Sequence, residues 1–528
     1  MNTERTKFCI LAAGRGSRNT VIGGLHKALV PIENRPVLSY ILDKVPLDME
    51  IVLAVGYKKE QIKSYVREVH SNRDIKFIEV ENYDGPGSGP GYSLLQCKQH
   101  LQCKFIFISA DTMIADECKY DNVEQNWIGV SSVNPAESGV YCLAKGEKYL
   151  ERLYYGTGSM AYIGIVGVKD YDIFWDFLSK NKIVKNEYQV IHGIEGLIKN
   201  KLLIKRYNRY YDTGNDASYY RTKIDFPKEI VPPKTDETIF IDNNKVVKYF
   251  ADENKLSKRI ERAKYIKNYI SEIRQLDKNM YAYNFIDGCL LSNLQSEQDF
   301  VRFLEFYNNG LGSKSFNKTC TFLLDCESMY KTKTLTRANH YSGTDLDAIK
   351  KINGIKVKPI MEILEHVDWD EILEKSSPRM FHGDLQPENI LFNRDTKDFN
   401  LIDWRETFGS STEIGDCYYD LSKLYHALII NGQTILKGLY SVDICSSDAF
   451  LEYNIRSNLM NLLQIFKTFC VDNEYDWRHV QLLGILHYIN IAPFYDNYEE
   501  GRYGKFLFLL GKMMLTKHFE KKELEYIL

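Results

Sequence analysis

A chain of 528 residues is too long for one hydrophobic core of ordinary size, so we expect two or three domains. Hydrophobic residues make up 44% of the chain and charged residues 26%, as in soluble globular proteins. The formal net charge of −3 excludes a general attraction to nucleic acid or to anionic membranes, so any phosphate binding has to be local. The sequence has no apolar run long enough to span a bilayer and does not start with a long signal-peptide core, so we expect a cytoplasmic protein.

The first predicted strand leads into a glycine-rich turn. Residues 8–13 are apolar and are followed by Gly14-Arg15-Gly16-Ser17-Arg18. Glycines let backbone N–H groups approach phosphate oxygens, and arginine adds positive charge where a triphosphate would lie. Lys27 follows in a second short segment, 26–32. We therefore predict a phosphate-binding turn with a nearby lysine.

Strands and helices alternate after this turn. Residues 50–57 and 75–80 are predicted buried strands, with an amphipathic helix over 59–66 between them. This alternation favours a parallel sheet with ligands at the carboxyl ends of its strands. The next segment, 85–91, is rich in glycine and enters a helix, so it would let a flat ring approach closely; a flexible surface loop is the alternative.

Two aspartates are candidate magnesium ligands. A predicted strand over 105–112 ends at Asp111, the place where a carboxylate would lie beside a triphosphate. Asp212, in Tyr210-Tyr211-Asp212-Thr213-Gly214, is the expected partner, although Asp-x-Gly is also a common turn. Residues 126–130 and 161–168 are predicted strands beside the second substrate, and 187–198 is a predicted helix over it.

These motifs resemble the nucleotidyltransferases that activate sugar phosphates and phosphocholine. That family opens with Leu-Ala-(Ala/Gly)-Gly-x-Gly-(Ser/Thr)-Arg and continues with Pro-Lys-(Ala/Pro)-Leu; here His26 replaces the proline and residues 19–24 replace the usual loop. The resemblance implies a Rossmann-like α/β domain with a mixed sheet over 1–228, a catalytic Lys27, and Mg²⁺ held by Asp111 and Asp212. It also implies nucleotide-binding residues in the turn and the later loop, namely Ala12, Ala13, Gly14, Gly16, Arg18, Gly89 and Gly91.

The pattern changes after a proline-containing linker at 229–236. Residues 238–241 and 245–250 are predicted antiparallel strands joined by a short turn. Lys248 lies in the middle of the second strand, where a kinase lysine would contact the α and β phosphates of ATP, and Glu261 would orient it through an ion pair. Glu253, Glu272 and a solvent-facing Lys248 are the alternatives.

A second group of polar residues follows at kinase spacing. Asp384 lies in His382-Gly383-Asp384-Leu385-Gln386-Pro387-Glu388-Asn389, and Asp403 follows a short apolar strand. At this spacing an aspartate orients the acceptor hydroxyl, while an asparagine and a second aspartate hold Mg²⁺ around ATP. A His-Gly-Asp turn between two core strands is the alternative.

This second group resembles the catalytic loop of the aminoglycoside phosphotransferase and choline kinase families, small-molecule kinases with a protein-kinase-like fold. The resemblance implies a bilobal α+β domain over 237–528, with an N-lobe at about 237–290 and a C-lobe at about 291–528 whose residues 419–528 are mainly helical. It implies Asn389 and Asp403 as metal ligands. It further assigns adenine contacts to Tyr283 and Ile286 in the hinge strand. It assigns support of the catalytic loop to His382 and Asp420, with Asp416 as a weaker candidate.

Together the two resemblances imply one reaction sequence. A kinase domain would phosphorylate a small alcohol or sugar with ATP, and the N-terminal domain would transfer a nucleotidyl group to the phosphomonoester. The precursor would serve a cell-surface polysaccharide such as a capsule, with CTP favoured as the NTP and choline, ethanolamine, a polyol or a sugar as the acceptor. The basic segment 330–337 would meet an anionic acceptor or form a solvated helix face. A protein kinase with a nucleotide-sensing domain and a non-catalytic scaffold are the alternatives, and the oligomeric state stays open.

Overall fold

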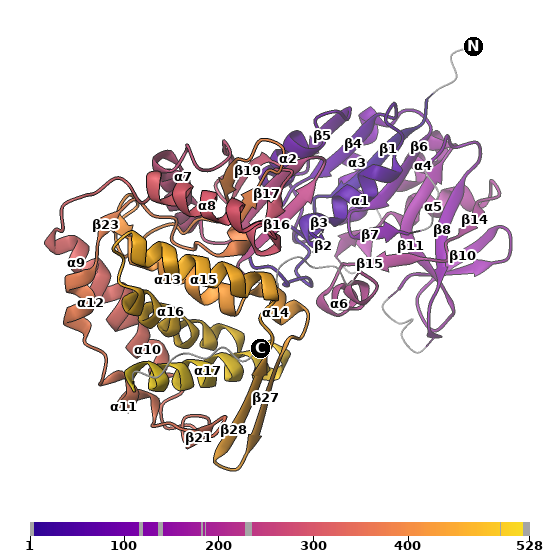
Figure 1. Cartoon of the computed structure of the whole chain (residues 1–528). Helices are drawn as coiled ribbons and strands as arrows, with labels where there is room; N and C mark the ends of the chain where they lie inside the picture. The colour runs from indigo at the N-terminus through magenta and orange to yellow at the C-terminus, as the bar shows by residue number, and fades with distance from the viewer. Residues whose placement is uncertain are drawn as a thin grey trace. The chain divides into compact units, whose positions relative to one another are not determined.

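The computed structural model describes residues 5–115, 120–135, 141–180, 183–184, 186–226, 235–496 and 498–520. Its contacts divide the chain into an N-terminal unit, Met1–Glu253 with Arg274–Phe285, and a C-terminal unit, Asn254–Ile273 with Ile286–Leu528 (Figure 1). The predicted linker falls mostly on residues 227–234, outside the described residues. Among those residues, no helix combines the length and the apolar composition needed to cross a bilayer.

A mixed sheet is the centre of the N-terminal unit, as predicted. Its strands follow the order β10-β9-β11-β6-β1-β4-β5. Strand β8 also pairs with β11, and β14 pairs with β8. The strands β4, β1 and β6 are parallel, whereas β11 runs antiparallel to β6. The bounds are β1 (Lys7–Ala12), β4 (Ile51–Val55), β5 (Ile75–Glu79), β6 (Phe105–Ser109), β8 (Trp127–Ser132), β9 (Leu143–Gly146), β10 (Leu150–Tyr154), β11 (Met160–Val168) and β14 (Leu203–Arg206).

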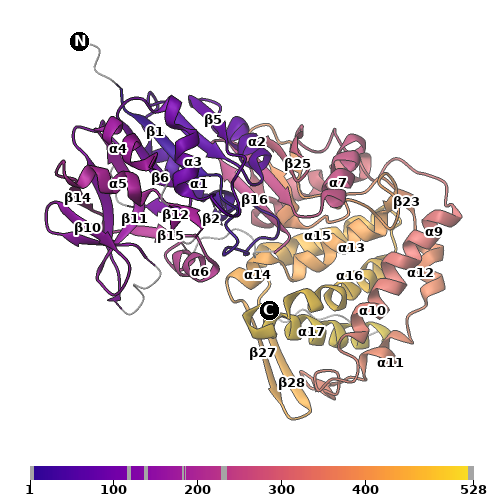
Figure 2. The ribbon, with the colours of Figure 1, turned by 180° about the vertical axis from the view of Figure 1, so that it is seen from behind.

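Helices cover both faces of this sheet (Figure 2). Phe8 and Ile10 of β1 pack into one core with α1 (Val37–Lys44) and α2 (Lys59–Val69). Cys9 and Leu11 face the opposite core, which contains residues of α3 (Pro90–Gln96), α4 (Tyr171–Leu178) and α5 (Ile191–Ile198). A strand buried on both faces has no polar alternation, which explains the continuous apolar run at 8–13.

The helix predicted over 187–198 is wrong in its first part. Strand β13 (Glu187–Tyr188) pairs with β12 (Ile183–Val184), and α5 begins only at Ile191. The N–H of Tyr188 donates to the carbonyl of Ser88 at 2.7 Å, so a contact distant in sequence holds this segment extended.

A second, antiparallel sheet has the order β16-β17-β19-β18 and confirms the predicted hairpin. Its strands are β16 (Glu237–Asp242), β17 (Lys245–Phe250), β18 (Arg274–Asp277) and β19 (Met280–Asn284). Phe240 and Val247 share a core with Tyr65 of α2, so contacts group this sheet with the N-terminal unit. The sequence places the same strands in the second domain; their role as a kinase N-lobe stays a prediction.

The C-terminal unit consists of helices and several small sheets. Helices α13, α15, α16 and α17 lie side by side in both views, and every residue of α13 is buried (Figures 1 and 2). The helices are α7 (Glu253–Tyr265, whose first residue belongs to the N-terminal unit), α8 (Glu297–Asn309), α9 (Cys320–Glu327), α10 (Lys333–Asn339), α11 (Ile360–Leu364), α12 (Trp369–Lys375), α13 (Cys417–Ile429), α14 (Gly432–Leu436), α15 (Ser457–Asp472), α16 (Trp477–Ile491) and α17 (Arg502–Phe519).

One hairpin interrupts the predicted helical region 419–528. Strands β27 (Tyr440–Cys445) and β28 (Asp448–Tyr453) pair antiparallel, and the short β21 (Lys351–Ile352) runs parallel to β28. Residues of β28 alternate between buried and exposed positions, but the exposed Phe450 interrupts the matching apolar–polar alternation in the sequence. A smaller sheet, β20 (Cys289–Leu290), β24 (Ile390–Phe392) and β25 (Phe399–Leu401), carries the predicted catalytic loop.

Candidate functional site

The first candidate site lies at the carboxyl ends of β1 and β6. These adjacent parallel strands carry the turn that starts at Ala13 and the segment that contains Asp111. The chain continues from β1 to β4 on one side and returns to β6 on the other. Loops at such a change of direction open a crevice in which open α/β sheets bind ligands.

Three predicted site residues meet at this edge. Lys27 Nζ lies 2.7 Å from Asp111 Oδ2. Asp212 belongs to β15 (Tyr210–Asp212), which pairs with β7 (Thr112–Ile114) so that Asp212 lies opposite Thr112. A Cβ placed on Gly214 would lie 3.0 Å from one carboxylate oxygen of Asp111 and 3.0 Å from one of Asp212, so both carboxylates flank this glycine.

The two carboxylates have opposite pKa shifts. Burial raises the pKa of Asp212, and the negative charge of Asp111 raises it further. Burial acts in the same direction on Asp111, but the Lys27 ammonium holds its pKa below the ordinary value. Two half-buried carboxylates beside one cation form a donor set that fits a divalent cation.

His26 and Gly16 position Lys27. His26 Nδ1 accepts a hydrogen bond from the N–H of Ala28 at 3.1 Å and so caps the short 3₁₀ helix Lys27–Leu29. Burial lowers the pKa of His26 to about 3, which keeps the ring neutral. Gly16 has a φ of +63°, and a Cβ there would lie 2.5 Å from Lys27 Cδ. His26, which replaces the usual proline, therefore still fixes the start of the segment that carries Lys27.

The loop after the glycine turn is tied to the segment that carries Asp212. Asn19 Nδ2 donates to the carbonyl of Thr213 at 2.8 Å. The N–H and the hydroxyl of Thr20 each donate to the carboxylate of Asp216 at 2.7 Å, and the N–H of Asp216 donates to the carbonyl of Arg18. Sequence reasoning missed this connection, since no local pattern links residues almost two hundred positions apart.

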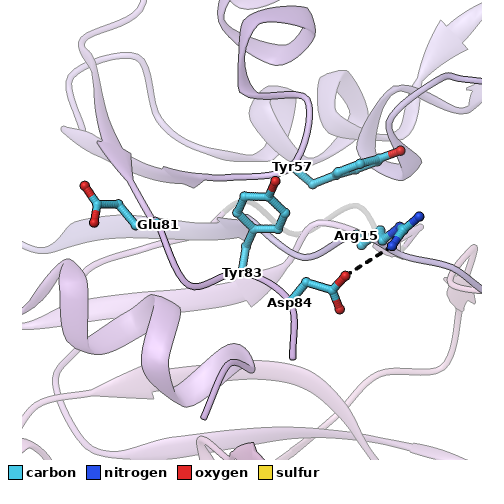
Figure 3. Close-up of a pocket in the computed structure, with 5 residues that line it drawn as sticks. All are labelled: Arg15, Tyr57, Glu81, Tyr83 and Asp84. Atoms are coloured by element: carbon cyan, nitrogen blue, oxygen red, sulfur yellow. Dashed lines mark hydrogen bonds and ion pairs between the residues drawn. The ribbon is translucent and has the colours of Figure 1, made fainter. Parts of the chain in front are cut away.

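A pocket of about 480 Å³ lies at the same edge of the sheet. Arg15, Tyr57, Glu81, Tyr83 and Asp84 line it, and they come from the segments that follow β1, β4 and β5 (Figure 3). Arg15 Nη1 lies 3.2 Å from Asp84 Oδ2, and its guanidinium carbon lies 5.7 Å from the centroid of the Tyr57 ring. Sequence reasoning placed Arg15 in the phosphate-binding turn but missed the other four as pocket residues. Tyr57 ends the predicted strand 50–57, and Glu81, Tyr83 and Asp84 follow the predicted strand 75–80.

Gly89 and Gly91 approach the protein's own backbone. A Cβ on Gly89 would lie 2.7 Å from the carbonyl oxygen of Tyr188, and one on Gly91 would lie 2.8 Å from the carbonyl carbon of Gln189. Packing therefore requires both glycines whether or not a base is bound. Their predicted contact with the nucleotide stays a prediction.

The second candidate site is in the C-terminal unit and centres on Asp384. Asn389 Nδ2 donates to Asp384 Oδ2 at 3.1 Å and to the Asp384 carbonyl at 2.9 Å. Gln386 donates to Oδ1 at 2.8 Å, and Lys423 Nζ lies 3.0 Å from the same oxygen. Burial opposes ionisation, but Lys423 and Gln386 hold the pKa of Asp384 well below its ordinary range. The Asp384 carboxylate is thus ionised at neutral pH and can accept hydrogen bonds.

Asp403 follows β25 and is tied to the same loop. The N–H of Ile402 donates to the Asn389 carbonyl at 2.9 Å, and Asp403 itself has a φ of +58°. Arg259 Nη1 donates to Asp403 Oδ1 at 2.7 Å. His382 Nε2 donates to the Ile402 carbonyl at 3.0 Å; burial lowers the pKa of His382 to about 4, so the ring is neutral.

Asp420 holds the backbone of the loop. Its oxygens accept hydrogen bonds from the N–H groups of His382 at 2.7 Å and Gly383 at 2.6 Å. Burial raises the pKa of Asp420 to about 6 against the effect of these two bonds. Asp416 instead accepts from Tyr330, Ser377 and Tyr418, away from these amides.

The remaining predicted residues belong to different units. Lys248 and Tyr283 lie buried in strands of the N-terminal unit, so a solvent-facing Lys248 is excluded. Glu261 and Ile286 belong to the C-terminal unit, where Glu261 accepts a hydrogen bond from the Thr412 hydroxyl at 3.2 Å. The Lys248–Glu261 ion pair and the adenine contacts stay predictions. The alternative Glu253 pairs with Lys278 at 2.6 Å.

Among the described residues, no group of three or more histidine, cysteine or acidic side chains is arranged to hold a metal ion. A magnesium ion at either pair of predicted ligands would take its other ligands from phosphate and water. This is the usual arrangement for Mg²⁺, which is commonly bound by one or two carboxylates together with substrate phosphates.

Comparison with known proteins identifies part of the N-terminal unit. Residues 8–137 match the family model of the MobA-like NTP transferase domain. The chain is 28% identical over 212 residues to "Bifunctional protein GlmU" of Methanocaldococcus jannaschii, covering 39% of this chain and 50% of that protein. It is 32% identical over 148 residues to the protein of the same name from Methanococcus vannielii, covering 27% and 34%. The chain thus spans about half, or less, of the length of these curated relatives.

Among solved structures, CTP:phosphocholine cytidylyltransferase from Streptococcus pneumoniae aligns at 19% identity with a TM-score of 0.34, covering 42% of this chain and 98% of that one. The family match confirms an NTP transferase domain in the N-terminal unit and ends at residue 137. The kinase-like interpretation of residues 237–528 stays a prediction from the sequence.

Proposed function

We propose that the N-terminal unit transfers a nucleotidyl group from an NTP to a phosphomonoester. The observation that carries this proposal is the meeting of Lys27, Asp111 and Asp212 at the carboxyl edge of a sheet whose sequence matches an NTP transferase domain. A phosphomonoester oxygen forms a bond to the α phosphorus, the bond to the β-phosphate oxygen breaks, and pyrophosphate leaves. Lys27 stabilises the charge that develops on the phosphoryl oxygens, while Arg18 and the backbone N–H groups of the glycine turn hold the triphosphate.

Magnesium fits both predicted sites by the chemistry of their donors. Asp111 and Asp212 would hold it in the N-terminal unit, and Asn389 and Asp403 would hold it in the C-terminal unit. When bound, Mg²⁺ supplies positive charge against the polyphosphate and helps to orient it. The residues of the chain supply the remaining positioning.

The pocket beside Arg15 and Tyr57 supports CTP as the nucleotide. Its aromatic rings offer surfaces for stacking against a base. Glu81 and Asp84 contribute carboxylates, which accept hydrogen bonds from an amino group such as N4 of cytosine but repel the O4 carbonyl of uracil. Cytosine therefore suits the pocket better than uracil does.

For the C-terminal unit we propose transfer of the γ-phosphoryl group of ATP to a small alcohol or sugar. Asp384 is ionised and accepts a hydrogen bond from the acceptor hydroxyl. The hydroxyl oxygen forms a bond to the γ phosphorus, the bond from that phosphorus to the β–γ bridging oxygen breaks, ADP leaves, and the hydroxyl proton passes through Asp384 to solvent. Asn389 and Gln386 fix the carboxylate, and Asp420 fixes the loop through the amides of His382 and Gly383. The product is a phosphomonoester, the substrate class proposed for the N-terminal unit, so the chain would make an NDP-activated precursor for a cell-surface polysaccharide.

The test measures both reactions in the same preparation. The full chain is incubated with Mg²⁺, ATP, CTP or UTP and a panel of alcohols and phosphomonoesters, and ADP and pyrophosphate are followed by mass spectrometry. We expect Asp384→Asn to abolish ADP formation while pyrophosphate release from a supplied phosphomonoester continues, and Asp111→Asn to do the reverse. Loss of both activities in each variant, with folding intact by circular dichroism, would overturn the assignment of two separate sites.

A further inference from the structure

Four basic side chains of the C-terminal unit gather around Tyr419, beside Asp384. We call Lys333, Arg337, Arg405 and Lys423 the cationic cluster. Lys333 and Arg337 are one turn apart on α10, and Lys423 lies one turn after Tyr419 on α13. Arg405 follows the predicted metal ligand Asp403 by two positions. Three separate parts of the chain thus bring positive charge to one place.

The contacts connect this cluster to the reacting carboxylate. Lys333 Nζ donates to the Tyr419 hydroxyl at 3.2 Å and lies 5.4 Å from the centroid of its ring. Lys423 Nζ lies 3.0 Å from Asp384 Oδ1. Lys423 is 8% exposed and Tyr419 is 1% exposed, and Lys333, Arg337 and Arg405 are half-buried, so water screens the charges of the cluster less than it does on an open surface.

The cluster carries more positive charge than the carboxylates that contact it. Asp384 pairs with Lys423, whereas Arg337 Nη1 donates to the Asn490 carbonyl and Arg405 Nε to the Thr407 carbonyl. An ionised Tyr419 and the negative charge of Glu406 also act on Arg405 and contribute to raising its pKa. Burial lowers the pKa of Lys333 to about 8. Although burial opposes it, Lys333, Arg405 and Lys423 lower the pKa of Tyr419 to about 7. Asp384, Glu406 and an ionised Tyr419 would together balance three of the four positive charges. The cations therefore stay in excess, and a net positive potential here favours an anionic ligand.

The local fold directs Lys333 toward the cluster. A π-helical segment, Ser328–Thr332, immediately precedes α10, and Tyr330 within it donates to Asp416 Oδ2 at 2.7 Å. Such segments interrupt regular helices and are frequent at functional sites. Lys331, two residues before Lys333, lines a different small cavity together with Trp369. The two lysines therefore point to different surroundings.

We propose that the acceptor alcohol carries an anionic group, a carboxylate or a phosphate, which the cationic cluster binds while the acceptor hydroxyl meets Asp384. This inference rests on the proposed phosphoryl transfer and narrows its substrate class. It excludes choline and ethanolamine as preferred acceptors, because their positive charge would be repelled by Lys333 and Arg405.

The first test compares alcohols that differ in charge, three of which share the three-carbon skeleton of glycerol. The full chain with ATP and Mg²⁺ is offered glycerol, glycerate, glycerol 3-phosphate, choline and ethanolamine, and ADP formation is measured. We expect kcat/KM for glycerate or glycerol 3-phosphate to exceed that for glycerol by roughly 10- to 100-fold, the scale of a hydrogen bond to a charged group. The glycerate and glycerol 3-phosphate arms distinguish a carboxylate from a phosphate.

The second test removes charge from the cluster. Lys333→Met is expected to raise KM for the preferred anionic acceptor by roughly 10-fold or more while KM for ATP changes little, and Lys333→Arg is expected to restore most of the loss. Lys331→Met is the matched control on the same stretch of helix and should leave both constants unchanged. Thermal unfolding of each variant shows whether the fold is kept, and the acceptor preference of the unmodified chain stands independently of the variants.

The outcomes separate the two proposals. ADP formation that is equal or faster with glycerol, choline or ethanolamine would overturn the anionic acceptor and leave phosphoryl transfer standing. A rise in KM for ATP instead of the acceptor in Lys333→Met would assign the cluster to the ATP phosphates and overturn the inference. Absence of ADP with every alcohol would overturn the proposed kinase function and the inference with it.

Discussion

Arg259 Nη1 donates to Asp403 Oδ1 at 2.7 Å, so a guanidinium holds the carboxylate that the sequence predicts as a magnesium ligand. The Arg259 side chain is 8% exposed, and its Nε also lies 3.6 Å from Glu406 Oε2. A cation on this carboxylate competes with a metal ion for the same oxygens. The positive charge of Arg259 on α7 should therefore weaken magnesium binding by Asp403 in the proposed phosphoryl transfer.

We predict that Arg259→Gln lowers the Mg²⁺ concentration needed for half-maximal ADP formation by roughly threefold to tenfold, the scale of an ion pair of about 1 kcal/mol. The change removes the competing charge but keeps a hydrogen-bond donor. Magnesium titrations of ADP formation and of pyrophosphate release measure the effect. Lys258→Gln, an exposed site on the same helix, is the control, and an unchanged or higher Mg²⁺ requirement in Arg259→Gln would contradict the prediction.

The carboxylates of Asp111 and Asp212 predict a pH effect that depends on magnesium. Burial and the charge of Asp111 raise the pKa of Asp212, so Asp212 takes up a proton at a higher pH than an ordinary aspartate does. Pyrophosphate release should therefore decline as the pH falls through this raised value, and it should be retained above it. Because Mg²⁺ favours the ionised carboxylate, a higher Mg²⁺ concentration should move the decline to lower pH.

Rate profiles at low and at saturating Mg²⁺ test this coupling. The expected result is a shift of the acidic limb of at least about half a pH unit, which corresponds to roughly 0.7 kcal/mol. ADP formation measured in parallel is the control for loss of activity through unfolding at low pH. An acidic limb that stays in place at all Mg²⁺ concentrations would show that Asp212 does not hold the ion.

The hydrogen bonds from Thr20 to Asp216 predict that Asp216 is a positioning residue, which holds the phosphate-binding loop without touching substrate. Asp216→Asn weakens the two hydrogen bonds that tie the phosphate-binding loop to the segment of Asp212. We expect kcat/KM for nucleotidyl transfer to fall by roughly threefold to tenfold, as for loss of about 1 kcal/mol of hydrogen bonding. Steady-state pyrophosphate release measures this.

The control for Asp216→Asn is Asp172→Asn. Asp172 is also an acidic residue in the first turn of a helix, but it is exposed and lies on α4. Both changes remove the same interaction with the helix dipole. Equal effects of the two substitutions on kcat/KM would refute a specific role for the Thr20–Asp216 link.

The carboxylate of Glu81 in the pocket predicts a preference for cytosine over uracil. Glu81→Gln replaces a pure acceptor by a group that also donates, so it should accept uracil better and cytosine less well. We expect the ratio of kcat/KM for CTP to that for UTP to fall by roughly threefold to tenfold, at the lower end of one base contact. Competition between the two nucleotides in one reaction gives this ratio directly. A ratio that does not move would separate the pocket in Figure 3 from base recognition.

Local sequence patterns were sufficient for the predicted segments whose geometry depends on near neighbours. The apolar run at 8–13, the glycine turn and the hairpin at 238–250 follow from strand burial and turn chemistry within a few residues. The spacing of Asp384 and Asn389 likewise places both side chains within hydrogen-bond distance. The helix predicted over 187–198 is wrong only in its first residues, because the partner of Tyr188 is Ser88, far away in the sequence, whereas Ile191–Ile198 is helical as predicted.

The sequence by itself determined the mixed α/β character of the N-terminal unit and the residue types of both candidate sites, because propensity and spacing are local properties of the chain. The resemblance predicted that Asp212 meets Asp111, but only the tertiary structure decided that Thr20 bonds to Asp216, that Arg259 holds Asp403, and that Lys333 meets Tyr419. Each of these pairs depends on strand pairing or helix packing between distant segments. Periodicity reports which face of an element is buried, but it does not report which distant element covers that face.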